Sequence, residues 1–357
     1  MSEAYIVGVG MTPLGRFPAR SVKDLTREAV VGALADAGLQ MSDIQEAWFS
    51  NTRQGLLEGQ NVIRGQCALR SMGFETIPVT NVENACASSS SALREAVAHI
   101  KAGLCDIALV VGADKMFFPE KREQMFRAFL GGTDVHETDA LLERLRALPG
   151  VPIPEGGASA VSLHSLFMDI YAAIARLHMK LYGTTVRQIA WAAHKNHFHS
   201  TRNPLSQYRH EISVDEVLAD PLVSWPLTRA MCAPISDGAA AAVVCNEAVL
   251  GRLGRTRAAQ VAAMALKMGS NRDPLDFDRH IGRAAALTAY EAAGIGPEDV
   301  DVAEVHDACA FAEIIQIENL GLCTRGEGGS FTERGMTTLG GRVPVNPSGG
   351  LVSKGHP

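Results

Sequence analysis

Short apolar stretches alternate with longer amphipathic segments over the first 115 residues of the chain. The apolar stretches have the length of β-strands and lie at 4–9, 46–50, 79–83 and 107–112. Two amphipathic segments are expected to be helices. One starts at the capping motif SVKD at 21–24 and ends at Gly38, and the other runs from Ser88 to about Lys101. This alternation predicts a parallel α/β layer.

The pattern of the first helix and the strand after it recurs 256 residues later. The segment REAVVGALADAGLQMSDIQEAWFSN, from Arg27, aligns with RAAALTAYEAAGIGPEDVDVAEVHD, from Arg283. The apolar positions correspond, and the same residue types coincide at Arg27/Arg283, Ala33/Ala289, Ala37/Ala293, Gly38/Gly294 and Asp43/Asp299. The chain is therefore expected to contain two copies of one α/β unit.

The region between the two copies differs from both. It is rich in His and Arg, and it contains the loop-like LPGVPIPEGG and the helical FMDIYAAIARLHMKLYG. We expect an N-terminal half at 1–116 and 225–250, an inserted loop domain at 117–224, and a C-terminal half at 251–357. The glycine-rich NPSGGLVSKGHP reaches Pro357 where the first copy continues with a helix and a strand, so we expect the C-terminal half to be truncated, with an exposed sheet edge.

Composition and charge exclude several classes of partner. Hydrophobic residues make up 46% of the 357 residues, the formal net charge is −6, and no run of Lys or Arg stands out, which argues against nucleic acid or an anionic membrane. No stretch approaches the roughly 20 apolar residues of a membrane span, and the N-terminus lacks a signal-peptide pattern. A cytoplasmic location is expected. Pro13 stands where a G-x-G-x-x-G dinucleotide loop needs glycine, so we expect no NAD site. HKNHFH at 194–199 lacks accompanying Cys or carboxylate ligands, so we expect no metal there and interpret the stretch as polar surface or as side chains that anchor a loop.

Cys86 has the most informative surroundings of the seven cysteines. No CxxC pair occurs, so free, mostly buried thiols are expected, with Cys67, Cys105, Cys232 and Cys245 in apolar or helical contexts. Cys86 follows a strand-like segment and precedes six small residues, 87–92. Such a helix start favours the thiolate and leaves room for a bulky acyl group, which predicts a nucleophile; the alternative is one more buried structural cysteine.

Two histidines are candidate partners for a cysteine nucleophile. His306, followed by Asp307, ends the strand-like VDVAEV, where catalytic groups collect in parallel sheets. His356 lies in SKGHP, where Gly355 lets the backbone approach a ligand. Each could be a hydrogen-bonded structural residue, but with Cys86 they suggest a Cys/His/His site built from both halves.

Four ordered motifs resemble those of thiolases of the sterol-carrier-protein-x or lipid-transfer-protein type. They are NVENACASSSSAL, CAPISDGAAAAVV at 232–244, EVHDACAFAEI and NPSGGLVSKGHP, and AAHKNHFHSTRNP is similar to the family's loop-domain segment. The resemblance implies an α/β thiolase-like fold. Two βαβαβαββ halves would form a five-layered core, the loop domain would cover the coenzyme A (CoA) site, and the protein would be a homodimer or homotetramer.

The resemblance also implies roles for the candidate residues. Cys86 would attack an acyl-CoA thioester to form an acyl-enzyme, His356 would activate the thiol, and His306 would help hold the oxyanion. Asp307 and Gly355 would support them, with no tightly bound cofactor, because the CoA thioester is the substrate. Relatives often read His-Asp-Cys-Phe; here Ala308 takes the third place and Cys309 follows, which makes Cys309 a displaced candidate acid/base.

Three functions are compatible with these motifs. The first is CoA-dependent acyl transfer in lipid or sterol metabolism, either cleavage of a 3-oxoacyl-CoA or condensation of acyl-CoAs. The second is a retro-aldol lyase acting on steroid side-chain CoA esters with an OB-fold partner subunit. The third is a noncatalytic acyl-CoA or lipid carrier subunit. Retention of Cys86, His306 and His356 favours the first.

Overall fold

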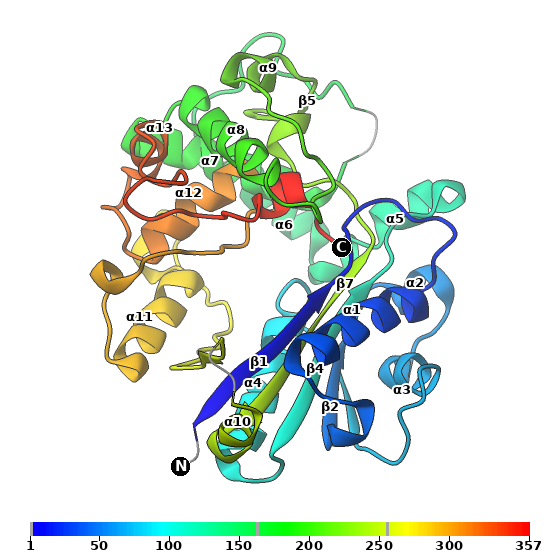
Figure 1. The fold of residues 1–357 in the computed structure, drawn as a ribbon. Coiled ribbons are helices and arrows are strands. Elements are labelled where there is room, and N and C mark those ends of the chain that lie inside the picture. Colours follow the sequence, from blue (N-terminus) through cyan, green and yellow to red (C-terminus); the bar gives the residue numbers. More distant parts are fainter. Residues whose placement is uncertain (1–2, 162–163, 255–256) are drawn as a thin grey trace. The chain divides into compact units, whose positions relative to one another are not determined.

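The computed structural model describes residues 3–161, 164–254 and 257–357, which form two compact units (Figure 1). The sheet unit comprises Met1–Arg122, Ile235–Leu266 and Pro357, and the helical unit comprises Glu123–Pro234 and Lys267–His356. The helical unit thus combines most of the expected loop domain with most of the expected C-terminal half. The division of the chain at 116, 224 and 250 stays a prediction.

A six-stranded mixed sheet forms the centre of the sheet unit. Its strand order is β3-β2-β4-β7-β1-β8, with β2 parallel to β3 and β4, and with β7 antiparallel to β4 and β1. The strands are β1 (Ala4–Met11), β2 (Glu46–Ser50), β3 (Val79–Val82), β4 (Ile107–Asp114), β7 (Gly238–Asn246) and β8 (Ala259–Gln260). The four strands predicted in the first 115 residues are confirmed.

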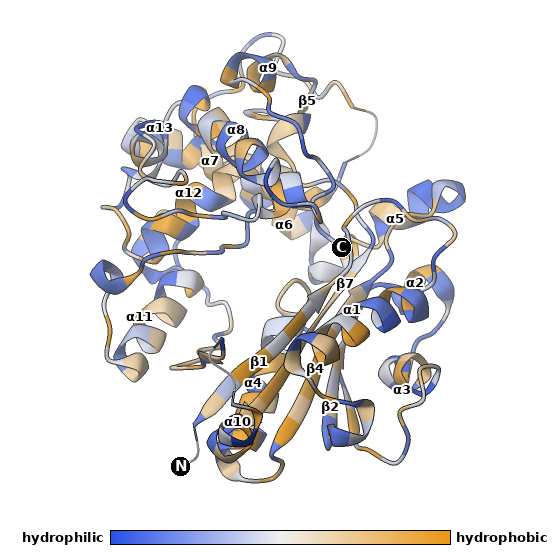
Figure 2. Ribbon diagram, in the orientation of Figure 1, coloured by the Kyte–Doolittle hydropathy of each residue, from blue (hydrophilic) through white to orange (hydrophobic). Residues whose placement is uncertain are grey.

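Helices cover both faces of this sheet. The helices of the sheet unit are α1 (Val22–Ala37), η1 (Met41–Asp43), α2 (Gln54–Glu58), α3 (Arg64–Arg70), α4 (Ser88–Ala102), η2 (Pro119–Lys121) and α10 (Glu247–Leu253). Alternate residues of β4 point to opposite faces, with Leu109 in the core beneath α1 and Val110 in the core beneath α4. Figure 2 shows the apolar character of these strands. The close approach of α1 to β1 requires Gly10, because a Cβ there would overlap Ala29 O.

The predicted ends of α1 and α4 are confirmed by their capping geometry. Ser21 caps α1 in a capping box with Asp24, and Gly38 ends the helix in the left-handed conformation with φ 68°. Gly103 ends α4 in the same way with φ 72°.

The helical unit packs around two apolar clusters. Its elements are η3 (Leu130–Gly132), α6 (Thr138–Ala147), α7 (Leu166–Tyr182), α8 (Val186–Ser200), α9 (Val214–Ala219), β5 (Leu222–Ser224), β6 (Leu227–Thr228), η4 (Arg229–Met231), η5 (Phe277–Arg279), α11 (Ile281–Ala293), η6 (Pro297–Asp299), α12 (Ala310–Asn319), α13 (Gly328–Glu333) and the π-turn η7 (Gly350–Lys354); α5 (Arg122–Arg127) lies at the boundary between the units. The larger cluster joins α7, α8, α9 and α12, and the smaller one joins α12 to α13 and Val345.

The internal repeat is visible in matching local structures. Gly294 ends α11 with φ 69°, as Gly38 ends α1, and η6 lies 256 residues after η1. Asp43 and Asp299 each accept the backbone N–H that precedes their 3₁₀ turn, at 2.7 and 2.8 Å. The match ends there: the predicted strand over VDVAEV does not form, and Ala303 makes only an isolated parallel bridge to Val345.

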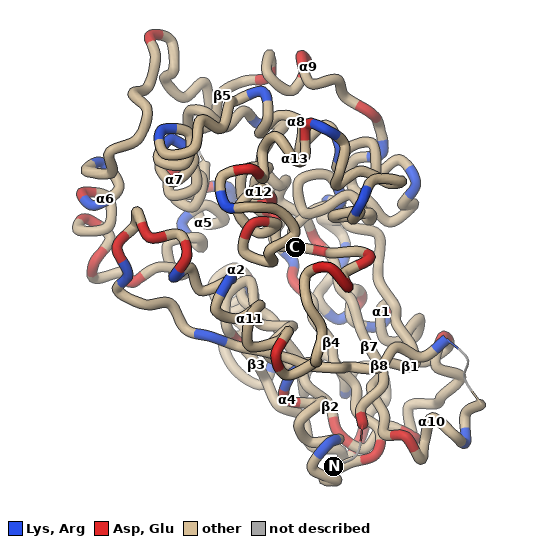
Figure 3. The backbone as a smooth tube through the Cα atoms, turned by 90° about the vertical axis from the view of Figure 1, so that its left-hand side faces the viewer, with Lys and Arg blue, Asp and Glu red and all other residues tan. Residues whose placement is uncertain are grey.

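Charged residues of both signs are interspersed along the backbone (Figure 3). This distribution agrees with the absence of Lys and Arg runs from the sequence. Among the described helices, none combines the length and the apolar character that crossing a bilayer would require.

Candidate active site

Cys86 lies on a tight turn between β3 and α4. Ala85 adopts φ 45°, an uncommon conformation for a residue with a Cβ, and its N–H donates to Glu83 Oε1 at 2.7 Å. Ser88 fastens the turn from the helix side, since its Oγ accepts from Asn84 N at 2.8 Å and donates to Ala85 O at 2.7 Å. Cys86 is an exposed residue and lies immediately before the first turn of α4, while its thiol itself is partly desolvated.

The thiol of Cys86 is not poised as a thiolate. Desolvation by the surrounding protein raises its pKa above the ordinary value, and the Arg53 guanidinium opposes that effect only in part. The backbone N–H at Cys86 acts in the direction expected for the start of α4, towards the thiolate, but desolvation outweighs it. At neutral pH the sulfur carries its proton, so its use as a nucleophile requires a base.

His306 and His356 come together in the helical unit. Their ring centroids are 5.2 Å apart, with the planes at 84°. Burial lowers the pKa of His306, so its imidazole is neutral at pH 7. Among the described residues of its own unit, no group forms a hydrogen bond with His306 Nε2. A neutral imidazole of this kind can donate an N–H to an oxyanion without carrying a charge.

Asp307 fastens the π-turn η7, which leads to His356. Its buried carboxylate accepts from Leu351 N at 2.6 Å and from Val352 N at 3.4 Å. Burial and the nearby Glu313 raise the pKa of Asp307 well above its ordinary range. Gly355 follows η7 with φ 120°, in a conformation that favours glycine.

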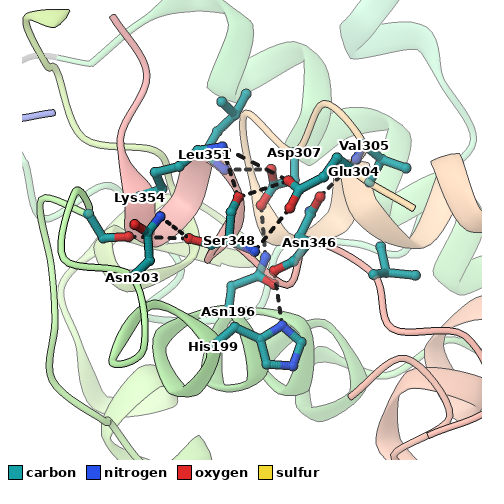
Figure 4. Close-up of polar contacts among 12 residues, drawn as sticks. Asn196, His199, Asn203, Glu304, Val305, Asp307, Asn346, Ser348, Leu351 and Lys354 are labelled. Carbon is teal, nitrogen blue, oxygen red and sulfur yellow. Dashed lines mark hydrogen bonds and ion pairs between the residues drawn. The ribbon is translucent and has the colours of Figure 1, made fainter. Parts of the chain in front are cut away.

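A buried polar network lies beside these segments, and Figure 4 shows its members Asn196, His199, Asp307 and Asn346. Lys195 of α8 is 2% exposed, and its Nζ lies 3.1 Å from Glu313 Oε1 of α12 and donates to Val345 O at 2.6 Å. The Asn196 side-chain amide donates to both carboxylates, Glu313 Oε2 and Asp307 Oδ2, at 2.8 Å each. One ammonium thus faces two buried carboxylates.

Asn346 connects this network to the segment before His306. It adopts φ 53°, its Oδ1 accepts from Val305 N at 2.7 Å, and its Nδ2 donates to Glu313 Oε2 at 2.9 Å. Its carbonyl oxygen accepts from His199 Nδ1 at 2.9 Å. Sequence reasoning assigned no role to Lys195, Asn196, Glu313 or Asn346.

Of the two expectations for HKNHFH, the polar surface is wrong, whereas the loop anchoring is confirmed. His194 Nδ1 donates to Ile212 O at 2.6 Å, and His199 Nε2 accepts from Leu339 N at 3.1 Å. The residues of HKNHFH form the end of α8, where Lys195, Asn196, His197 and His199 are all buried. A sequence signal existed: the helical spacing of Ile189, Ala193 and Asn196 continues one buried face into the polar residues.

Cys309 lies in the apolar core of the helical unit. Its side chain is 0% exposed, and burial raises its pKa to about 12. The structure therefore gives Cys309 surroundings unlike those of a proton carrier. All seven cysteines are free, but only Cys105, Cys245 and Cys309 are buried, so the expectation that most are buried is wrong.

Family comparisons support the motifs. Residues 4–248 match the family model described as "Thiolase, N-terminal domain", and residues 241–357 match "Thiolase C-terminal domain-like". A solved structure described as "Ltp2-ChsH2(DUF35) aldolase" is similar in fold, with a TM-score of 0.77, 22% sequence identity, and coverage of 99% of this chain and 86% of that one.

Similar proteins cover the chain nearly end to end. Sterol carrier protein 2 of Oryctolagus cuniculus is 34% identical over 100% of this chain, which spans 63% of that protein's length. Acetyl-CoA acetyltransferase of Methanothermobacter thermautotrophicus is 33% identical, with coverage of 100% and 87%, and benzoylsuccinyl-CoA thiolase subunit BbsB of Thauera aromatica is 32% identical, with coverage of 99% and 85%. These matches confirm the resemblance carried by the four motifs: the chain belongs to the thiolase family.

Proposed function

We propose that this chain carries a CoA-dependent acyltransferase activity, cleaving a 3-oxoacyl-CoA or condensing acyl-CoAs through an acyl-enzyme on Cys86. The observation that carries the proposal is the presentation of an exposed Cys86 on the Ala85 turn at the start of α4, in a chain of the thiolase family. Substrates in lipid or sterol metabolism follow from the name of the sterol carrier protein 2 relatives.

The roles divide among three side chains. With an acyl-CoA, His356 takes the proton from the Cys86 thiol, the sulfur attacks the thioester carbonyl, and the C–S bond to CoA breaks with return of the proton to the leaving thiolate. With a 3-oxoacyl-CoA, the sulfur attacks the 3-oxo carbonyl, the C2–C3 bond breaks, and a proton goes to C2 of the departing acetyl-CoA. His306 donates an N–H to the oxyanion, a role that its lowered pKa supports because a neutral imidazole remains at pH 7. Gly355 allows the positive φ that the backbone adopts just before His356, and Asp307 holds η7 in place by accepting its backbone N–H groups.

Cys309 has no part in this proposal as an acid/base. A thiol with pKa about 12 inside an apolar cluster exchanges protons poorly at pH 7. We assign it to the core. The proposal retains the cytoplasmic location and the absence of a metal that the sequence analysis expects. From the family resemblance it takes a homodimer or homotetramer, a CoA thioester as substrate and no tightly bound cofactor.

A retro-aldol lyase is the second candidate, because the similar solved structure is described as an aldolase with ChsH2(DUF35). An OB-fold partner subunit belongs to this alternative, and a noncatalytic carrier is a third outcome. The alternatives differ in their need for Cys86.

Thiolysis of acetoacetyl-CoA by Cys86→Ser separates the candidates. Cys67→Ser is the matched control, since Cys67 is a free, half-buried thiol of the same unit. We expect Cys86→Ser to lose at least about a thousandfold in turnover and Cys67→Ser to lose less than about threefold. Equal turnover of Cys86→Ser and the wild type would reject the acyl-enzyme, and an absence of thiolysis in the wild type would favour the lyase or the carrier.

A further inference from the structure

The Lys195–Glu313 ion pair lies at the junction of three chain segments in the helical unit. Lys195 comes from α8, Glu313 from α12, and the carbonyl that accepts from Lys195 belongs to Val345, just before Asn346. Both charged side chains are at most 2% exposed. In such a pair each charge compensates the desolvation of the other, because removing one would leave the other buried without a counter-charge.

Two amides extend the effect of this pair to the histidines. The Asn346 side chain accepts a hydrogen bond from Val305 N and donates one to Glu313. These two bonds fix Val305, the residue that precedes His306. Asn196 donates to Glu313 and to Asp307, and Asp307 in turn accepts from two backbone N–H groups of η7, at its second and third residues. The segments of His306 and His356 are thus both tied to Glu313.

Close packing adds to the hydrogen bonds between Asp307 and η7. Gly350 starts η7 with φ 57°, and a Cβ there would overlap Asp307 Oδ2 and lie 2.8 Å from Asn196 Nδ2. The backbone of η7 therefore lies against the carboxylate and the amide, so a displacement of either side chain displaces the turn.

We propose that Lys195 is a positioning residue for the acyl-transfer site. By neutralising Glu313, it allows Asn346 to hold the segment before His306, and it allows Asn196 and Asp307 to hold the segment before His356. This proposal rests on the proposed function. Lys195 acts through Glu313 and the two amides, without contact with the reacting atoms. Small displacements of groups that orient a reaction reduce the rate strongly, by about a hundredfold for 1 Å in unfavourable cases.

Four variants test the proposal. Lys195→Met removes the ammonium and keeps an unbranched chain, while Lys195→Met/Glu313→Gln removes both charges and keeps an oxygen that can accept from the amides. Asn346→Gly tolerates φ 53° but loses the side-chain link to Val305 and Glu313, which provides a second disruption if Lys195→Met fails to fold. Arg187→Met is the control, since Arg187 lies on the same helix in an exposed ion pair with Asp215.

The first measurement is the single-turnover rate of Cys86 acetylation by acetyl-CoA, per folded protein, at varied acetyl-CoA concentration. Lys195→Met and Asn346→Gly are expected to lower the maximal rate by about tenfold or more, with the half-saturating concentration changed less than about threefold. Adding Glu313→Gln should return the rate to within about threefold of wild type, and Arg187→Met should leave it unchanged. Lower thermal stability with an unchanged rate, or no recovery in the double variant, would overturn the proposal.

The second measurement is hydrogen–deuterium exchange at Leu351 and Val352, whose N–H groups donate to Asp307. We expect exchange at least about tenfold faster in Lys195→Met and less than about twofold faster in Arg187→Met. This readout does not depend on catalysis. A wild type that exchanges as expected but is never acetylated would reject the proposed function, whereas equal exchange in both variants would reject the role of Lys195.

Discussion

Substituting Gly350 by Ala tests how tightly the buried network holds η7. The left-handed φ of 57° costs a residue with a Cβ about 1–2 kcal/mol, and the overlap with Asp307 Oδ2 adds about 1–3 kcal/mol because a fully buried carboxylate cannot move aside. We therefore expect Gly350→Ala to lower the free energy of unfolding by about 2–5 kcal/mol.

Gly335→Ala provides the matched control. Gly335 has φ 77° in the same unit, but a Cβ there would meet no atom within 4 Å. Both substitutions carry similar backbone strain and similarly restrict the unfolded chain, so the difference between them isolates the overlap with Asp307. Urea unfolding followed by circular dichroism should give a difference of about 1–3 kcal/mol. A difference below about 0.5 kcal/mol would refute the close packing of η7 on the network.

The remaining predictions concern Cys309, His199 and Cys86. Cys309→Ser should cost about 1–3 kcal/mol in urea unfolding, since it places a hydroxyl in an apolar cluster, while thiolysis stays within about twofold of wild type; lost turnover with intact stability would make Cys309 an acid/base. Burial lowers the pKa of His199 to about 4, so between pH 6.5 and 4 this imidazole is protonated in the unfolded state but not in the folded state. The free energy of unfolding should therefore fall by up to about 3 kcal/mol as the pH falls through this range. His199→Gln should flatten that decline, and an unchanged slope would contradict the assignment. Because the pKa of Cys86 is raised, its alkylation by iodoacetamide should still accelerate above pH 9, and a plateau reached by pH 8 would be inconsistent with a desolvated thiol.

Local signals made much of the sheet unit predictable. The ends of α1 follow from Ser21, Asp24 and Gly38, and the end of α4 follows from Gly103, because capping depends on residues a few positions apart. The prediction of a strand over VDVAEV is wrong because strand formation depends on residues far away in the sequence. Strands need pairing partners that are distant in sequence, and Ala303 finds only the single bridge to Val345.

The candidate site was predictable in its motifs but not in its support. Small residues after Cys86 and glycine before His356 are visible in the sequence, whereas the charge of Lys195 is compensated by a carboxylate 118 positions away. Taken alone, a lysine and three histidines in six residues indicate solvent exposure. Only the fold reveals the partners that permit their burial.

Intact-protein mass spectrometry after brief incubation with acetyl-CoA, followed by peptide mapping, tests the central claim most directly. The account predicts one acetyl group per chain, located on Cys86, in the wild type and in Cys67→Ser. Unmodified Cys86, or an acetyl group that persists in Cys86→Ala, would contradict it.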